Sequence, residues 1–90
     1  MEEKFLFALE ANRQKAESLG ARIRPITDIQ QAHRCLSGSR ESDGFNILAQ
    51  KGRLDLSLEA LAVDKRFGAL FTDEEANNAL QRLLNAGYYY

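Results

Sequence analysis

The chain is poor in the residues that hold many small proteins together. It has one cysteine, Cys35, and one histidine, His33, among its 90 residues. A single cysteine cannot form a disulfide within the chain, which is typical of proteins that fold in a reducing compartment. A structural zinc ion needs four nitrogen or sulfur ligands, so one cysteine and one histidine are too few. We therefore expect neither a disulfide framework nor a metal site.

Cys35 and His33 are also poor candidates for covalent catalysis. They are two residues apart in a predicted helix, where side chains at that spacing point in different directions. They cannot form a Cys–His dyad. We expect His33 to be a hydrogen-bonded packing residue on the apolar edge of its helix, and Cys35 to be a small, half-buried apolar residue.

Long hydrophobic runs are missing too. Before Glu10, only the five residues "FLFAL" are apolar in succession, and Glu2 and Glu3 precede them. A membrane-spanning helix needs about 20 apolar residues, and a secretory signal needs a basic start and a longer apolar run. The net charge of −1 supplies no general attraction to nucleic acid or to an anionic membrane. We expect a cytoplasmic protein without a membrane partner.

The motifs that usually mark an enzyme are absent. The stretch "GSRESDG" contains glycines and serines, but it lacks a preceding strand and a final Lys–Ser/Thr pair, so it is not a phosphate-binding loop. Glu74 and Glu75 are adjacent carboxylates, yet their place in the first turn of a helix explains them as partners of the helix dipole. We expect no enzymatic activity and no cofactor.

Hydrophobic periodicity predicts an all-α fold in a single domain that covers residues 1–90. Apolar residues make up 44% of the chain and charged residues 28%, which is ordinary for a globular protein. Five short helices are expected, at 2–19, 28–37, 45–51, 58–67 and 73–86. An internal loop is expected at 37–44, and "RLDL" at 53–56 alternates as a minimal strand would.

Capping residues predict where the helices in the first two thirds of the chain begin. Gly20 is expected to end the first helix, and Pro25 forbids helix in the connector that follows. Thr27 and Gln30 form a T-x-x-Q capping box that would open the second helix. Ser57 is expected to cap the fourth helix.

The last helix has the clearest boundaries. Thr72 and Glu75 form a full capping box, with acidic residues in the first turn. Gly87 is expected just after the helix in the left-handed conformation. The Schellman geometry that this glycine allows would fold Tyr88 back onto Leu83.

Apolar side chains in excess of what a small core needs indicate an interaction surface. Phe7 projects near Gln14 and Ser18, on the side of its helix that should meet water. The fourth helix is apolar on two sides, which indicates packing between other elements or a place at an interface. Tyrosine, enriched at interfaces, occurs three times at positions 88–90. The predicted interface residues are Phe7, Val63, Phe67, Tyr88, Tyr89 and Tyr90.

These observations favour a non-enzymatic interaction or regulatory module that forms a homodimer or binds a protein partner. One alternative keeps the same residues within a monomer. In that alternative, the tyrosines cover the side of the first helix that carries Leu6 and Phe7, and no interface exists.

A second alternative comes from the order of elements after Phe45. Helix, short extended segment, helix, turn and capped helix, followed by "AGYYY", resembles the core of a winged-helix domain, which implies binding to nucleic acid. Asp73, Glu74 and Glu75 open the helix that would enter the groove, and phosphates would repel them. Protein interaction is therefore the leading hypothesis. The residues predicted to contact nucleic acid are Arg53, Lys65, Arg66, Asn78, Gln81 and Arg82.

Overall fold

The computed structural model describes residues 2–38 and 41–88, and within these residues the chain forms five α-helices and no strand. The all-α class predicted from the sequence is confirmed. The α-helices are α1 (Glu2–Ser18), α2 (Ile29–Ser37), α3 (Phe45–Gln50), α4 (Leu58–Ala62) and α5 (Asp73–Asn85), and two 3-10 helices are η1 (Leu54–Leu56) and η2 (Gly68–Leu70).

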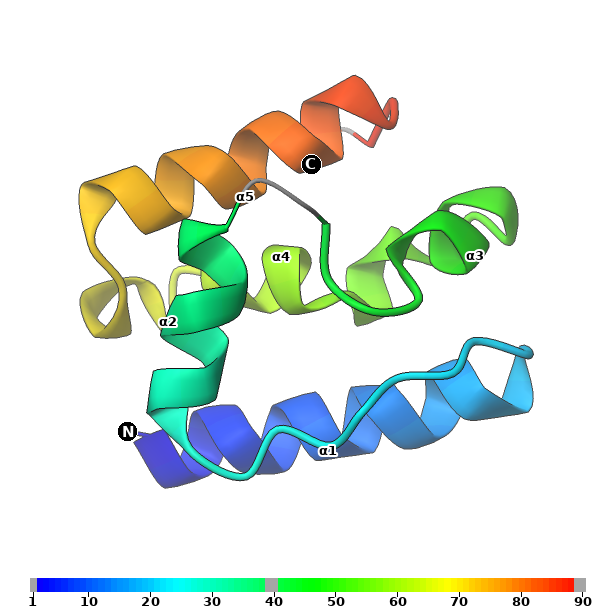
Figure 1. The fold of residues 1–90 in the computed structure, drawn as a ribbon, viewed down its shortest axis with the longest axis horizontal. Coiled ribbons are helices and arrows are strands. Elements are labelled where there is room, and N and C mark those ends of the chain that lie inside the picture. The colour runs from blue at the N-terminus through cyan, green and yellow to red at the C-terminus, as the bar shows by residue number, and fades with distance from the viewer. Residues whose placement is uncertain (1, 39–40, 89–90) are drawn as a thin grey trace.

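The short helix α4 lies at the centre of the fold. Figure 1 shows α1 (blue) and α5 (orange) on opposite sides of the molecule with α4 between them, and α4 contacts both. Helix α2 crosses from the α1 side toward α5 and packs against it. Because α4 is enclosed, four of its five residues are buried, including a charged one: Leu58, Glu59, Leu61 and Ala62.

Helix α1 forms and ends as the sequence predicts. Glu2 and Glu3 lie in its first turn, where carboxylates are favoured by the helix dipole. Phe5, Leu9 and Ala16 are its buried residues. Gly20 follows the helix with a φ of 96°, a conformation that glycine adopts without strain.

Helix α2 begins one residue later than its predicted capping box. The prediction that Thr27 caps with Gln30 is wrong. Asp28 is the N-cap and its carboxylate accepts a hydrogen bond from the Gln31 backbone at 2.9 Å. The Gln31 side-chain oxygen in turn accepts from the Thr27 N–H at 2.8 Å. Asp is the better N-cap because its ionised oxygens accept more strongly and interact with the helix dipole.

The segment around α4 differs from its prediction in two ways. Residues 54–56 form the 3-10 helix η1 instead of an extended segment, so that Leu54 and Leu56 are both buried. The predicted cap at Ser57 is confirmed, because its hydroxyl accepts from the Ala60 N–H at 3.2 Å. However, α4 ends at Ala62, and the chain then turns so that Phe67 enters the core.

Both predicted ends of α5 are confirmed. Thr72 and Glu75 exchange backbone-to-side-chain hydrogen bonds in a complete capping box. At the other end, Gly87 has a φ of 81°. The Tyr88 N–H donates to the Leu83 carbonyl at 2.9 Å, and the Gly87 N–H donates to Leu84 at 3.0 Å. This pair of bonds is the Schellman motif.

The core consists of two adjoining clusters. One is built around aromatic rings, with Phe5 packed edge-on against Phe67 and Phe71 at centroid distances of 5.3 and 5.1 Å. Such T-shaped contacts suit the charge distribution of the rings. The other cluster gathers aliphatic side chains from α3, η1 and α5, including Leu48 and Leu83. Val63 packs against both clusters.

Candidate functional site

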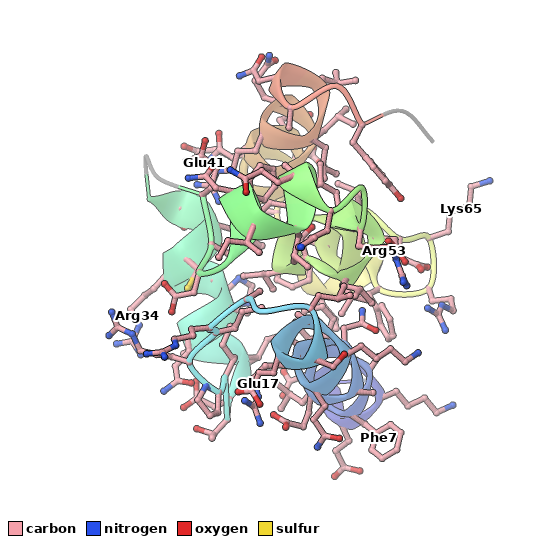
Figure 2. The ribbon with its side chains drawn as sticks, turned by 90° about the vertical axis from the view of Figure 1, so that its right-hand side faces the viewer. Phe7, Glu17, Arg34, Glu41, Arg53 and Lys65 are labelled. Atoms are coloured by element: carbon pink, nitrogen blue, oxygen red, sulfur yellow. The ribbon has the colours of Figure 1, made fainter. Side chains whose placement is uncertain are left out.

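Phe7 is the most exposed large apolar side chain in the described part of the chain. Its exposed fraction is 79%, whereas Leu84, the other exposed one, reaches 40%. Figure 2 shows the Phe7 ring projecting from α1 away from the body of the molecule. The sequence predicts this position from the polar neighbours of Phe7 on the helix.

A shallow groove runs beside Phe7, between α1 and the turn after α4. Ala8 and Ala11 of α1 line it, and Leu61 and Phe67 lie beneath. Its rim is polar, with Glu3, Lys4, Asn12 and Arg66. We call the face formed by Phe7, Ala8 and Ala11 the Phe7 surface. It combines one large apolar side chain with two small ones that leave room for another chain to approach.

The other predicted interface residues lie elsewhere. Phe67 is buried among Phe5 and its neighbours, with the Arg66 guanidinium 5.0 Å from its ring centroid. Val63 is half-buried between the two core clusters. Tyr88 is half-buried and packs against the cluster that contains Leu83. Tyr89 and Tyr90 lie outside the described residues. Only Phe7 therefore offers a fully exposed apolar ring among the described members of this set.

The residues predicted to contact nucleic acid do not form one surface. Arg82 reaches inward and pairs with the buried Glu59 at 3.1 Å. Asn78 donates its amide to the Leu36 carbonyl at 3.0 Å. Gln81 is exposed and donates to Asn85. Because Arg82 is the one cation in the sequence of α5, its inward turn leaves the exposed face of that helix without positive charge.

The remaining predicted cations lie on turns. Arg53 is exposed and pairs with Asp55, and Arg66 pairs with Asp64. Lys65 is exposed, and Figure 2 shows it extending away from the molecule. Arginines neutralised by adjacent carboxylates provide little net attraction for phosphates. This arrangement gives no support to a nucleic-acid interface.

His33 has the packing role expected from the sequence. Its Nδ1 lies 2.7 Å from the Glu75 carboxylate, and its ring packs edge-on against Phe71. Burial works against ionisation of Glu75. Hydrogen bonds from the Thr72 backbone and from His33 outweigh this effect and hold the pKa of Glu75 below its ordinary value. The pair links α2 to the start of α5.

Cys35 is exposed, so the expectation of a half-buried residue is wrong. The helix turns Ala32 and Leu36 toward the core, which directs Cys35 into a surface cleft instead. Desolvation at the cleft wall raises the pKa of the Cys35 thiol, and the carboxylates of Asp43 and Glu59 raise it further. A raised pKa keeps the thiol protonated and weakly nucleophilic, which argues against a catalytic role.

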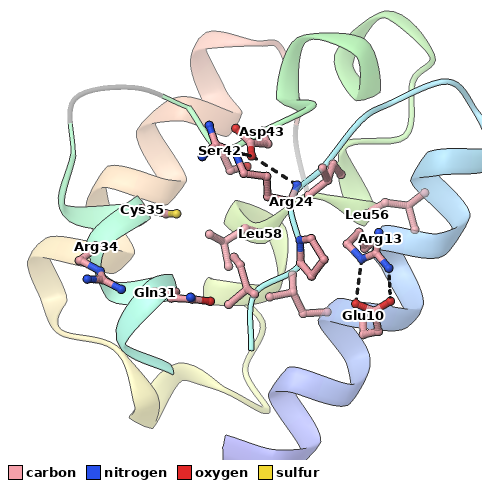
Figure 3. Close-up of a pocket in the computed structure, with 14 residues that line it drawn as sticks. Glu10, Arg13, Arg24, Gln31, Arg34, Cys35, Ser42, Asp43, Leu56 and Leu58 are labelled. Atoms are coloured by element: carbon pink, nitrogen blue, oxygen red, sulfur yellow. Dashed lines mark hydrogen bonds and ion pairs between the residues drawn. The ribbon is translucent and has the colours of Figure 1, made fainter. Parts of the chain in front are cut away.

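This cleft, which we call the Cys35 cleft, has a volume of about 370 Å³. It lies where the connector before α2 passes over α1, with α2 on one side and the Ser42–Asp43 turn on another (Figure 3). Residues from five separate segments meet there, so no local sequence pattern marks it. Its polar groups do not converge on a metal. In the described residues, no group of three or more His, Cys, Asp or Glu side chains could hold one.

The ion pair between Glu59 and Arg82 was not predicted, because the sequence suggested Arg82 only as a nucleic-acid contact. One signal was available. A helix that is apolar on two sides lies between other elements, and a glutamate within it must then be buried with a partner. The identity of that partner, 23 residues away on α5, could not be read from local periodicity.

Comparisons with known proteins found no match to a protein-family model, to a curated protein or to a solved structure. In the described residues, no helix is both long enough and apolar enough to cross a bilayer.

Proposed function

We propose that this protein is a non-enzymatic interaction module that self-associates by pairing its α1 helix with the α1 helix of a second copy. The observation that carries the proposal is the exposure of Phe7, at 79%, in the N-terminal half of a regular helix. An aromatic ring in this position gains stabilisation when water is removed from it.

The spacing of residues along α1 suits a helix pair. If Phe7 is assigned to position d of a heptad, Gln14 is the next d residue. Lys4, Ala11 and Ser18 then occupy position a. The seam thus has one large anchor and small or flexible neighbours, so a second helix can approach closely.

The charges beside this seam favour a parallel arrangement. Glu3, Glu10 and Glu17 occupy position g, and Lys15 occupies position e. In a parallel pair, a g residue of one helix faces the e residue five positions further along the other, so Glu10 faces Lys15 of the second copy. An antiparallel pair would instead bring the glutamates of both copies together. Charge complementarity therefore selects parallel pairing.

Glu10 remains available for this contact. It is ionised, because its hydrogen bonds with Arg13 hold its pKa below the ordinary value. Its side chain is 38% exposed. A carboxylate has about four acceptor sites. Glu10 uses three of them for two hydrogen bonds from Arg13 and one from Gln14, so one remains for Lys15 of the second copy.

The association is weak. Stable interfaces bury roughly 1,200–2,000 Å² and contain several anchor residues, whereas this surface has one. We expect a dissociation constant of about 100 µM or more, which corresponds to about 5.5 kcal/mol or less. Association of this strength responds to local protein concentration, as a regulatory contact requires.

Sedimentation equilibrium tests the proposal. The apparent mass of the wild-type protein should rise from the monomer value toward the dimer value between about 10 µM and about 1 mM, the range that brackets this affinity. Phe7→Gln should abolish the rise. Leu84→Gln is the matched control, since it removes the other exposed large apolar side chain and should change nothing. An unchanged monomer mass at the highest concentration rejects self-association, and an equal effect of both variants rejects the assignment to Phe7.

A further inference from the structure

The Cys35 cleft has an apolar floor and a polar rim. Leu9, Ile26 and Leu58 lie on its floor, and α2 supplies Gln31, Arg34 and Cys35 on one side. Figure 3 shows Gln31 and Cys35 pointing from α2 into the cleft, beside Leu58. The volume of about 370 Å³ is within the range of about 300–1,000 Å³ that is usual for small-molecule sites.

Gln31 is held in a fixed orientation. Its side-chain oxygen accepts a hydrogen bond from the Thr27 N–H at 2.8 Å, which completes the cap of α2. The Nε2 group therefore remains as a donor, and it has no acceptor among the residues that the structure describes. A preorganised donor of this kind costs little entropy to use in binding.

The arginines of the cleft differ in their availability. Arg13 pairs with Glu10 and Glu17, and Arg24 pairs with Asp43. Arg34 makes no ion pair with any residue in the described ranges 2–38 and 41–88. It precedes Cys35 and lies one helical turn from Gln31. The available positive charge and the available amide donor therefore lie one helical turn apart on α2, with the Arg34 side chain extending outward from the helix (Figure 2).

We infer that the Cys35 cleft binds a small amphipathic carboxylate. Its carboxylate is held by Arg34 and the Gln31 Nε2, and its apolar portion covers the Cys35 thiol and the Leu58 side of the floor. Of the three arginines that line the cleft, Arg34 is the one without a carboxylate partner among the described residues, and one available guanidinium matches a monoanion. A guanidinium suits this role because its planar donors fit a carboxylate.

Apart from Glu10, which also faces Lys15 in the proposed helix pair, this site and the Phe7 surface are formed by different residues. Glu10 and Arg13 line the cleft from one face of α1, whereas Ala8 and Ala11 line the Phe7 groove from another. Loss of dimerisation and loss of carboxylate binding can therefore be observed independently, and Phe7→Gln should leave carboxylate binding unchanged.

Cys35 provides the readout. Because the chain has one cysteine, alkylation by N-ethylmaleimide followed by mass spectrometry reports on this position alone. Decanoate, at concentrations below its micelle threshold, should slow alkylation of the wild-type protein several-fold in a saturable manner. Decanol has the same chain without the charge, and it should protect at least about tenfold more weakly, as expected from the loss of a charged hydrogen-bonding group.

Variants of two exposed arginines, one at the cleft and one remote from it, complete the test. Arg34→Gln should weaken protection by decanoate about five- to tenfold, the value of a charge-assisted contact at a partly exposed site. It should leave protection by decanol unchanged. Arg53→Gln, which removes an exposed arginine remote from the cleft, is the control and should have no effect. The inference is overturned if decanoate does not slow alkylation, if decanol protects equally well, or if Arg34→Gln and Arg53→Gln behave alike.

Discussion

Arg82 and Glu59 form an ion pair in the interior of the fold. The Arg82 Nη1 lies 3.1 Å from the Glu59 Oε2, and the two side chains are 10% and 0% exposed. Ser42 donates to the same carboxylate from its backbone and its hydroxyl. Arg82 also donates to the Leu36 and Gly38 carbonyls at the end of α2. One pair thus holds α4, α5, the end of α2 and the turn before α3 together.

Removing Arg82 should destabilise the protein strongly. Arg82→Met leaves Glu59 buried without its cation and should lower the free energy of unfolding by about 3–5 kcal/mol, the usual cost of an unpaired buried charge. Urea unfolding followed by circular dichroism measures the change. Glu59→Gln keeps an acceptor for Ser42, so it should cost less than Arg82→Met and remains measurable if the latter does not fold.

An exposed ion pair supplies the control for this prediction. Arg53→Met breaks the contact with Asp55 on the surface and should change the free energy of unfolding by less than about 1 kcal/mol. Equal effects of Arg82→Met and Arg53→Met would show that the buried pair has no special role in stability.

The placement of Arg82 shows where prediction from sequence reaches its limit. Local signals were sufficient for the two ends of α5, since Thr72, Glu75 and Gly87 act within one helical turn. The sequence predicts Arg82 and Asn78 as nucleic-acid contacts, which requires both side chains to face solvent. That assignment is wrong because α2 packs against α5. The last carbonyls of α2 need hydrogen-bond donors, and Asn78 and Arg82 supply them. The contact joins residues more than 40 positions apart, which no local pattern encodes.

Replacing Gly44 with a residue that has a side chain is expected to destabilise the fold for steric reasons. It has a φ of 76°, and a Cβ atom there would lie 2.7 Å from Cγ1 of Ile23. Gly44→Ala should therefore lower the free energy of unfolding by the left-handed strain of about 1–2 kcal/mol and by the cost of the clash in addition. Thermal or urea unfolding gives the value.

Gly52 separates these two contributions. Its φ of 69° is similar, but nothing lies within 4 Å of an added Cβ. Gly52→Ala should show the strain alone. If the two substitutions cost the same, then Ile23 does not pack against Gly44 in solution.

Acid should weaken the contact between α2 and α5. The pKa of Glu75 is lowered on folding, so its contribution to stability is complete above its ordinary value of 4.5 and is lost as the pH falls through the lower folded value. Glu75→Gln lacks this dependence. Urea midpoints for the two proteins should differ most at neutral pH and converge only as the pH falls below the lowered folded pKa of Glu75. A constant difference across this range would contradict the role of the ionised carboxylate.

The candidate sites differ in how far the sequence predicts them. Phe7 could be identified because a single helix defines both its apolar neighbours and its polar face. Phe67 could not be placed correctly, because the turn after Ala62 redirects it into the core next to Phe5. The Cys35 cleft depends on how the connector passes over α1. Only the assembled tertiary structure brings those segments together.

The most direct test of parallel pairing through α1 is a disulfide between two copies. In a Cys35→Ser background, Gln14→Cys places a thiol at the d position next to Phe7, where identical residues of a parallel pair meet. Under mild oxidation at about 100 µM protein, close to the expected dissociation constant, we expect rapid formation of a covalent dimer. Adding Phe7→Gln should abolish it, and Asn77→Cys on the exposed face of α5 should form little. Equal cross-linking at positions 14 and 77, or none at position 14, would contradict the proposed pairing.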